Sequence, residues 1–201
     1  MVLQLVCEVA IRPHGKNEAV GIDLGLKEGM TLSTGKKVEN SRVFAKYEDD
    51  LATAQRANKA RRVQAIHAKI VNTRKDFLHK ETTKIADTFG LVCVGDISGR
   101  WLQATNGKSS ADASTGMSRN MLRYKAMARG ATFVDVSEHL STQTCSDCGA
   151  LGIRLRHRFT CSCGLRAHSD VNAARNHARM GGAMALSRAA VKQPEVAEIP
   201  F

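Results

Sequence analysis

Twelve residues separate Cys145-Ser-Asp-Cys148 from Cys161-Ser-Cys163, which is followed by Asp170-Val-Asn-Ala-Ala-Arg-Asn176, and this stretch decides the fold. Two close cysteine pairs suit a tetrahedral Zn²⁺, because each short loop presents two sulfurs at about 2.3 Å from the ion. The second pair needs a tighter loop, and Gly149 and Gly164 directly after the pairs offer the positive φ that such turns require. The sequence therefore predicts a structural zinc ion held by Cys145, Cys148, Cys161 and Cys163.

A disulfide pair or a cluster of buried thiols is the alternative interpretation of these cysteines. The first eight residues lack the basic segment of a secretory signal and already include a charge at Glu8. We therefore expect a cytoplasmic protein, and a reducing cytosol favours metal over disulfides. Cys7 and Cys93 stand alone in apolar runs and are expected to pack as small hydrophobic side chains.

Length and charge limit the class of protein. The 201 residues allow one main domain plus a small zinc module, and no apolar run approaches the roughly 20 residues of a membrane span. Lys and Arg number 30 against 19 Asp and Glu, a net charge of +11, which favours a polyanionic partner such as DNA.

The basic excess is concentrated between residues 56 and 80, where Asp76 is the single acid. We predict that this helical region binds nucleic acid, whereas the alternative is the ordinary charged face of a solvated helix. The candidate nucleic-acid-binding residues are Arg56, Lys59, Arg61, Arg62, Lys69, Arg74 and Lys75.

Strand and helix patterns alternate along the chain, which indicates an α/β fold. Strands are expected at 1–10, 20–25, 90–95 and 131–136, with a hairpin at 31–38 that turns at Gly35. Helices are expected at 47–89, with a break near Asn72, at 112–129 and at 170–187, and residues 193–201 are expected to form a loose tail.

Acidic residues stand at the ends of two apolar strands and at the start of the last helix. Asp23 closes the first of these strands, Asp96 follows the run at 90–95, and Asp170 begins the helix. Because ligands gather at strand ends in α/β sheets, we expect these carboxylates to face one cleft. Such a cluster can hold Mg²⁺ ions about 4 Å apart, which clamp the attacking water and the leaving oxygen of a phosphodiester. As structural alternatives, Asp23 would form a turn and Asp170 would cap its helix. Glu138, after the last strand, is expected to order the segment leading to the cysteines.

Five motifs make the sequence resemble the C-terminal part of the TnpB/OrfB family of transposon-encoded proteins. They are Gly21-Ile-Asp-Leu-Gly25, Val94-Gly-Asp-Ile97, Thr142-Gln-Thr-Cys-Ser-Asp-Cys-Gly149, Phe159-Thr-Cys-Ser-Cys-Gly164 and Asp170-Val-Asn-Ala-Ala-Arg-Asn176. The resemblance implies a RuvC-like nuclease domain of RNase H-like fold, with a mixed sheet, flanking helices and an inserted zinc ribbon. It further implies a guide-RNA-directed DNA endonuclease that uses Mg²⁺, in which Asp23 matches the first catalytic acid and Asp170 the third.

The resemblance also divides the chain into parts. Residues 1–140 correspond to the first part of the RuvC-like domain, 141–168 to the zinc ribbon and 169–188 to the domain's last helix, and 189–201 form a flexible tail. Relatives carry an N-terminal nucleic-acid-recognition region of which only the last strand, at 1–10, is matched. The chain therefore resembles a truncated or decayed copy.

Gly95 is the main departure from the family pattern, because the second acid of the family is a Glu at this position. Three alternatives stay open: Asp96 replaces it from the next position, Asp112 replaces it from the start of the following helix, or the site is inactive. Asp96 points to the opposite face if the strand continues through it, since side chains alternate with period two. Two functions compete accordingly, a metal-dependent DNA endonuclease and a catalytically inactive nucleic-acid-binding derivative or regulator. A transposase accessory role is a further alternative, and no Tyr-based strand-transfer motif is evident.

Overall fold

A computed structural model describes residues 11, 14–25, 28–96, 114–138 and 141–191, without the side chains of 188–191. The strand expected at 1–10, the side chains of Cys7 and Asp112, and the tail at 193–201 lie outside the described residues.

Five strands form one mixed sheet in the order β3-β2-β1-β4-β5. β1 is parallel to β4 and β4 to β5, whereas β2 is antiparallel to β1 and β3. Their bounds are Ala19–Leu24 (β1), Met30–Leu32 (β2), Lys37–Val38 (β3), Leu91–Gly95 (β4) and Thr132–Val136 (β5). Because β1, β4 and β5 are parallel, their carboxyl ends meet at one edge, at Asp23, Gly95 and the residues after Val136.

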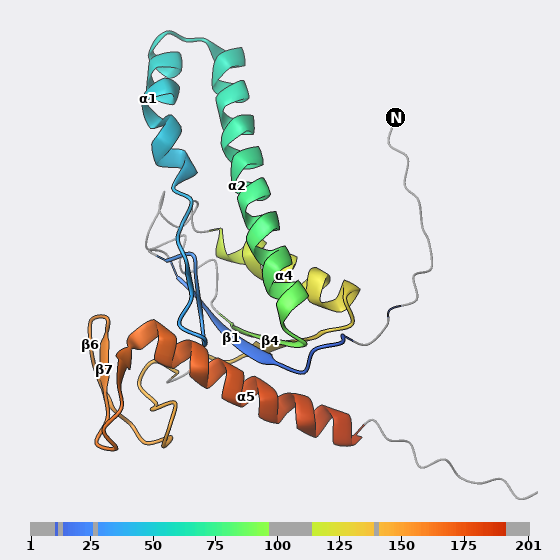
Figure 1. Cartoon of the computed structure of the whole chain (residues 1–201). Coiled ribbons are helices and arrows are strands. Elements are labelled where there is room, and N and C mark those ends of the chain that lie inside the picture. The colour runs from blue at the N-terminus through green and yellow to red at the C-terminus, as the bar shows by residue number, and fades with distance from the viewer. Residues whose placement is uncertain (1–10, 12–13, 26–27, 97–113, 139–140, 192–201) are drawn as a thin grey trace, which may run out of the picture.

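Helices cover both faces of the sheet (Figure 1). α2 (Ala60–Thr88) and α4 (Thr115–Ala128) pack over one face, where Ile22, Val94 and Leu122 belong to the main hydrophobic core. α5 (Ser169–Val191) crosses the other face against Cys93, Val134 and Val136. This arrangement confirms the α/β fold with a mixed sheet and flanking helices.

Gly21 allows α5 to lie directly on β1. A Cβ atom at this position would stand 1.8 Å from the carbonyl oxygen of Ala174, so no other residue fits without moving the helix. Ala173 and Ala174 are fully buried, because only small side chains fit at this crossing. Side chains alternate along β1, and Asp23 therefore shares the α5 face with Gly21.

α1 (Val43–Arg56) and α2 form an antiparallel hairpin that projects from the sheet (Figure 1). The chain turns at residues 57–59, where Asn58 has a positive φ of 50°. The break expected near Asn72 is wrong, because α2 runs through that residue without interruption. The hairpin has a core of its own, made by Val43, Leu51, Ala54, Ile66 and Ile70.

The segment with the four cysteines forms a small antiparallel ribbon beside the start of α5 (Figure 1). Its strands are Ile153–Leu155 (β6), Arg158–Thr160 (β7) and Arg166–His168 (β8), and Phe159 is its buried residue. Gly149 and Gly164 have φ values of 78° and 96°, as the turns after the cysteine pairs were expected to require. Among the helices of the described part of the chain, none combines the length and the apolar character needed to cross a membrane.

Candidate active site and metal centre

Asp23 and Asp170 lie close to each other at the carboxyl edge of the sheet. Asp23 is the fifth residue of β1, and Asp170 lies in the first turn of α5, the helix that packs on β1. Burial, and then the negative charge of Asp170, raise the pKa of Asp23 to about 7, and Arg154 opposes both effects. Two carboxylates held together in this way form a place where a cation would be stabilised.

Asp170 is held by the residues around the start of α5. Its backbone N–H donates to Nδ1 of His168 at 3.3 Å, and the Ser169 hydroxyl donates to its Oδ1 at 3.1 Å. Lys37 Nζ lies 3.2 Å from Nε2 of His168 and donates to Glu28 at 3.1 Å, so the β2–β3 hairpin contacts the same corner. The carboxylate of Asp170 therefore comes from a rigid helix start.

Asp96 directly follows β4 beside this site, but its carboxylate pairs with a residue on the opposite face of the sheet, the face that α4 covers. Its backbone N–H continues the ladder by donating to Val136 at 2.8 Å, and Arg119 of α4 donates to its carboxylate at 2.5 Å. Arg119 also binds Asp135 at 2.8 Å, so one guanidinium joins two acids on the α4 side of the sheet. The position of Asp112 is outside the described residues, and both acids remain predictions as metal ligands.

Glu138 follows the last strand of the sheet, as expected, but its carboxylate also reaches the site, a role that the sequence analysis did not assign to it. Two residues beyond β5, it turns its carboxylate toward Gly95 and His177, under α5. Burial, followed by the negative charges of Asp23 and Asp96, raises the pKa of Glu138 to about 7, and Arg119 opposes these effects. The signal available in the sequence was the alternation Val134, Val136, Glu138, which puts Glu138 on the same face as the two buried valines.

The four ribbon cysteines form a cluster. Their sulfur atoms all lie within 4.8 Å of one another, with 3.6 Å between Cys145 and Cys163 and also between Cys148 and Cys161. A tetrahedral ion with bonds of about 2.3 Å needs sulfurs about 3.8 Å apart, so the cluster fits such an ion. A hydrogen bond from the backbone of Cys163, together with the neighbouring thiols, lowers the pKa of the Cys161 thiol to about 7, whereas the pKa values of the Cys148 and Cys163 thiols are raised within the same cluster.

Asn172 and Asn176 tie this cluster to α5. Asn172 accepts from the backbone N–H of Ser146 at 3.0 Å and donates to the carbonyl of Thr144 at 2.7 Å. Asn176 donates to the carbonyls of Ser141 at 2.8 Å and Thr144 at 2.7 Å. Both asparagines are fully buried, so the helix that carries Asp170 also fixes the first cysteine loop.

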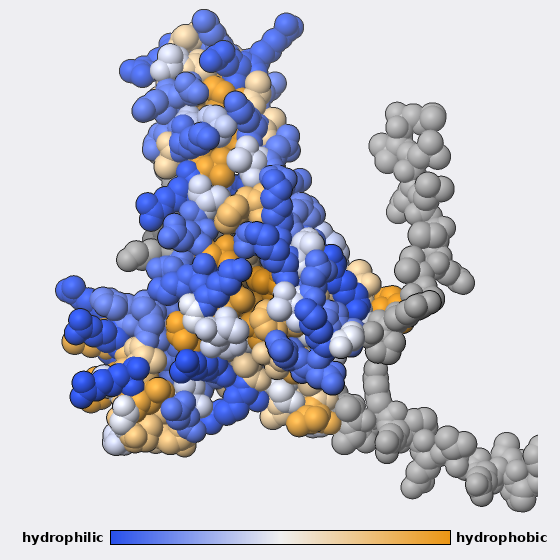
Figure 2. All heavy atoms as spheres, in the orientation of Figure 1, coloured by the Kyte–Doolittle hydropathy of each residue, from blue (hydrophilic) through white to orange (hydrophobic). Residues whose placement is uncertain are grey.

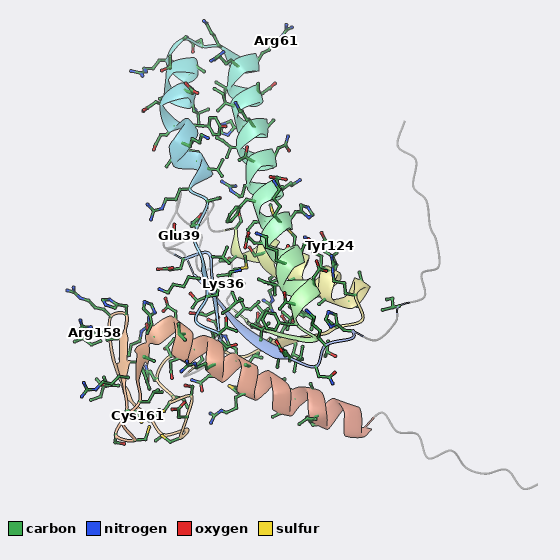
Figure 3. All side chains as sticks on the ribbon, in the orientation of Figure 1. Lys36, Glu39, Arg61, Tyr124, Arg158 and Cys161 are labelled. Carbon is green, nitrogen blue, oxygen red and sulfur yellow. The ribbon has the colours of Figure 1, made fainter. Side chains whose placement is uncertain are left out.

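The predicted basic region forms the exposed tip of the hairpin and part of α2. Arg56, Lys59, Arg61 and Arg62 are exposed around the turn, and Arg61 is labelled there in Figure 3. Lys69 lies over the ring of Tyr47 at 5.1 Å, Lys75 is exposed, and Arg74 is half-buried. Hydrophilic side chains cover most of the visible hairpin (Figure 2), and the ribbon adds the exposed arginines Arg154, Arg156, Arg158 and Arg166.

Two family profiles match the chain. A family described as "Probable transposase" matches residues 4–102, and a family described as "Cas12f1-like, TNB domain" matches residues 116–177. The first range contains β1, the hairpin and β4, and the second contains α4, β5, the ribbon and the start of α5. Together they cover the two acids and the four cysteines of the candidate site.

Curated relatives agree with these profiles. A putative RNA-guided DNA endonuclease of Streptomyces pristinaespiralis is 37% identical over 194 residues, 87% of this chain and 48% of that protein. The putative RNA-guided DNA endonuclease InsQ of Escherichia coli K12 is 29% identical over 215 residues, 90% of this chain and 54% of that protein. The chain thus spans about half the length of these relatives.

Solved structures show the same fold. A Cas12f1–sgRNA–target DNA complex matches with a TM-score of 0.59 at 17% identity, over 80% of this chain and 49% of that one. A CRISPR-Cas12f ternary complex matches with a TM-score of 0.63 at 16% identity, over 87% and 41%. The expected RuvC-like fold of RNase H type is confirmed, and the cysteine cluster is compatible with a zinc ribbon. With both halves of its sequence matched to these profiles and relatives, the chain belongs to the TnpB/OrfB family of transposon-encoded proteins.

Proposed function

We propose that this protein hydrolyses phosphodiester bonds of DNA with Mg²⁺ at the carboxyl edge of the sheet, directed by a bound RNA. The observation that carries the proposal is the pair Asp23 and Asp170, close enough for one charge to raise the pKa of the other. Bound Mg²⁺ would supply the charge that activates water and stabilises the leaving oxygen. Asp23 and Asp170 would hold it, and Arg154 of the ribbon would help to neutralise the approaching phosphate.

The ribbon cysteines are proposed to hold a structural zinc ion. Cys145, Cys148, Cys161 and Cys163 supply a complete set of four sulfur ligands, which leaves no position for a substrate or water. The role of this ion would be to keep the ribbon folded and its arginines in place beside Asp23.

DNA and a guide-type RNA are the proposed partners. The net charge of +11 and the exposed basic tip of the hairpin support binding to phosphate backbones. Two relatives are named as putative RNA-guided DNA endonucleases, and one structural neighbour was solved in complex with sgRNA and target DNA. The target sequence would be selected by base pairing between the RNA and the DNA. This chain would therefore recognise the shape and the phosphate charge of the nucleic acid and would need no side chains that read individual bases.

The test starts from the protein expressed with the DNA that flanks its gene, so that its RNA copurifies. The RNA is sequenced, and target DNA complementary to its variable end is offered with Mg²⁺. We expect cleavage only of DNA that matches the RNA. If the complex cuts matched and unmatched DNA equally, the RNA-guided part of the proposal is wrong.

A catalytically inactive nucleic-acid-binding protein is the second candidate, and Gly95 is the observation that favours it. The family places a carboxylate at this position, and glycine offers none. Such a protein would bind matched DNA in the same experiment and leave it intact in Mg²⁺.

A further inference from the structure

The space that a side chain at Gly95 would need is filled by the carboxylate of Glu138. A Cβ atom on Gly95 would lie 2.2 Å from Oε1 of Glu138, 3.0 Å from its Cδ and 2.7 Å from Cε1 of His177. A carboxyl oxygen thus stands where the first side-chain atom of a glutamate at residue 95 would begin. The lost carboxylate and the present one therefore compete for one volume.

The strand register explains how Glu138 reaches this place. Gly95 pairs with Val136 in the parallel ladder between β4 and β5. Cys93, Val134 and Val136 face α5, and alternation puts Gly95 and Glu138 on that face too. Asp23 faces the same helix from β1, so Asp23 and Glu138 flank the vacant Cβ position of Gly95 from the two neighbouring strands.

Two buried polar atoms meet at this point without a hydrogen-bond partner in the described part of the chain. They are Oε1 of Glu138 and Nε2 of His177, and the His177 side chain is fully buried. Nδ1 of His177 lies 3.1 Å from the carbonyl oxygen of Ile22, which can only accept, so Nδ1 carries the proton and Nε2 is left as an acceptor. Unpaired buried acceptors of this kind are costly, and a hydrated cation would satisfy both.

We propose that Glu138 replaces the carboxylate missing at Gly95 and binds the divalent metal ion together with Asp23 and Asp170. The inference rests on the proposed function, since it completes the same site. The sequence left open whether Asp96 or Asp112 replaces the missing acid or the site is inactive. The inference instead assigns this position to Glu138, which follows the neighbouring strand β5. The carboxylate of Asp96, by contrast, accepts a hydrogen bond from Arg119 on the α4 side.

The first test measures Mn²⁺ binding to the full chain, with zinc already in the ribbon, by the electron paramagnetic resonance signal of free Mn²⁺. Glu138→Gln keeps the shape of the side chain and removes its charge, and we expect a loss of affinity of at least about tenfold. Glu18→Gln is the matched control, because Glu18 is exposed at the opposite end of β1, and its affinity should equal that of wild type. Wild-type affinity in Glu138→Gln would overturn the inference.

Asp23→Asn separates this inference from the function on which it rests. If Asp23→Asn loses Mn²⁺ binding while Glu138→Gln keeps it, the metal site stands and the role of Glu138 is wrong. If both variants bind like wild type, the proposed metal site is wrong as well.

A second test moves the carboxylate between strands. Gly95→Glu alone should weaken Mn²⁺ binding and lower the melting temperature, because its Cβ would collide with Glu138. Adding Glu138→Ala removes the collision with Glu138, and the His177 ring, whose Cε1 lies 2.7 Å from the same Cβ position, must turn to admit the new side chain. Glu138→Ala alone should lose affinity, and the double variant should return to within about threefold of wild type. Wild-type affinity in Glu138→Ala, or a double variant as weak as Glu138→Ala, would overturn the proposal.

Discussion

Asp23 bears the electrostatic cost of the site when no divalent cation is bound. Its pKa rises from 3.8 to about 7 in the folded protein, first through burial and then through Asp170. The folded state therefore holds a proton that the unfolded chain releases, so the free energy of unfolding falls as pH rises from about 4 to about 7. Above pH 7 the full cost is present.

Asp23→Asn should therefore stabilise the protein at pH 8 without Mg²⁺ or Mn²⁺. The melting temperature is expected to exceed that of wild type by about 5 °C at pH 8. The difference should shrink to a small remainder at pH 4, where Asp23 is protonated in the folded protein and about half protonated in the unfolded chain. Asp49→Asn, on the exposed side of α1, is the control and should change little at either pH. A wild type more stable than Asp23→Asn at pH 8 would contradict this account of Asp23.

Adding Mn²⁺ at pH 8 should reverse this order. Metal that binds the folded state alone raises its stability, and Asp23→Asn has lost a ligand. Thermal melts with and without Mn²⁺ measure the effect. An equal rise in melting temperature for wild type and Asp23→Asn would show that Asp23 is not a ligand of the metal ion.

The sequence places Asp23 and Asp170 correctly at a strand end and a helix start, because both positions follow from local patterns. Glu138 does lie in the segment before the cysteines, as the sequence indicates, but its place beside Gly95 depends on the pairing of β4 with β5. A single sequence does not reveal that pairing. Gly95 marks a missing side chain in the sequence, but the atom that fills its space comes from a residue more than 40 positions away.

At the scale of elements, α5 connects the carboxyl edge of the sheet, with the candidate site, to the ribbon. Asp170 faces Asp23, Ala174 lies on Gly21, and Asn172 and Asn176 hold the loop of the first cysteines. The motif that begins at Asp170 thus supplies a carboxylate, a close contact and two anchors from successive turns. The sequence predicted the helix but not these anchors, because their partners are backbone carbonyls.

Asn176→Ala should loosen the ribbon without removing its metal ligands. The carbonyls of Ser141 and Thr144 lose a buried donor, which costs about 1–3 kcal/mol of stability. Chemical denaturation measures the loss, and zinc content should stay near that of wild type. Asn120→Ala, at an exposed position of α4, is the control, and equal stability of the two variants would refute the anchoring role.

Zinc removal should unfold the ribbon and leave the hairpin intact. Purified protein is expected to contain about one zinc per chain, and Cys145→Ser with Cys161→Ser should abolish it and lower the melting temperature. Elemental analysis gives the content. Unchanged zinc and stability in the double variant would show that the cluster does not hold the metal.

The hairpin tip is expected to contact phosphates. Charge reversal of Arg61 and Arg62 removes about two contacts, so the slope of log affinity against log salt should flatten by about 2. The control is charge reversal of Lys16, just before β1, and of Lys84, near the end of α2 that leads to β4. This control changes the net charge by the same amount and should leave the slope unaltered. Equal slopes for wild type and the tip variant would show that the tip is an ordinary solvated surface that does not contact phosphates.

At the scale of the whole molecule, acidic and basic regions are separated. The carboxylates gather at one edge of the sheet, while exposed cations lie on the hairpin tip and on the ribbon. Under the proposed function, such a layout would let the basic surfaces hold a phosphate backbone while the carboxylates hold the metal ion at one bond. The composition predicted the basic character of the chain. The basic residues gather at the tip of the hairpin because the chain turns at residues 57–59 and not near Asn72.

The most direct test of the account is single-turnover cleavage of matched target DNA by the RNA-bound protein, with Mg²⁺ added to start the reaction. Wild type should cut, whereas Asp23→Ala and Asp170→Ala should bind the target equally well and cut at least about a thousandfold more slowly. A wild-type complex that binds its target and leaves it whole in Mg²⁺, or an Asp23→Ala complex that cuts at the wild-type rate, would contradict the central claim that these carboxylates form a catalytic metal site.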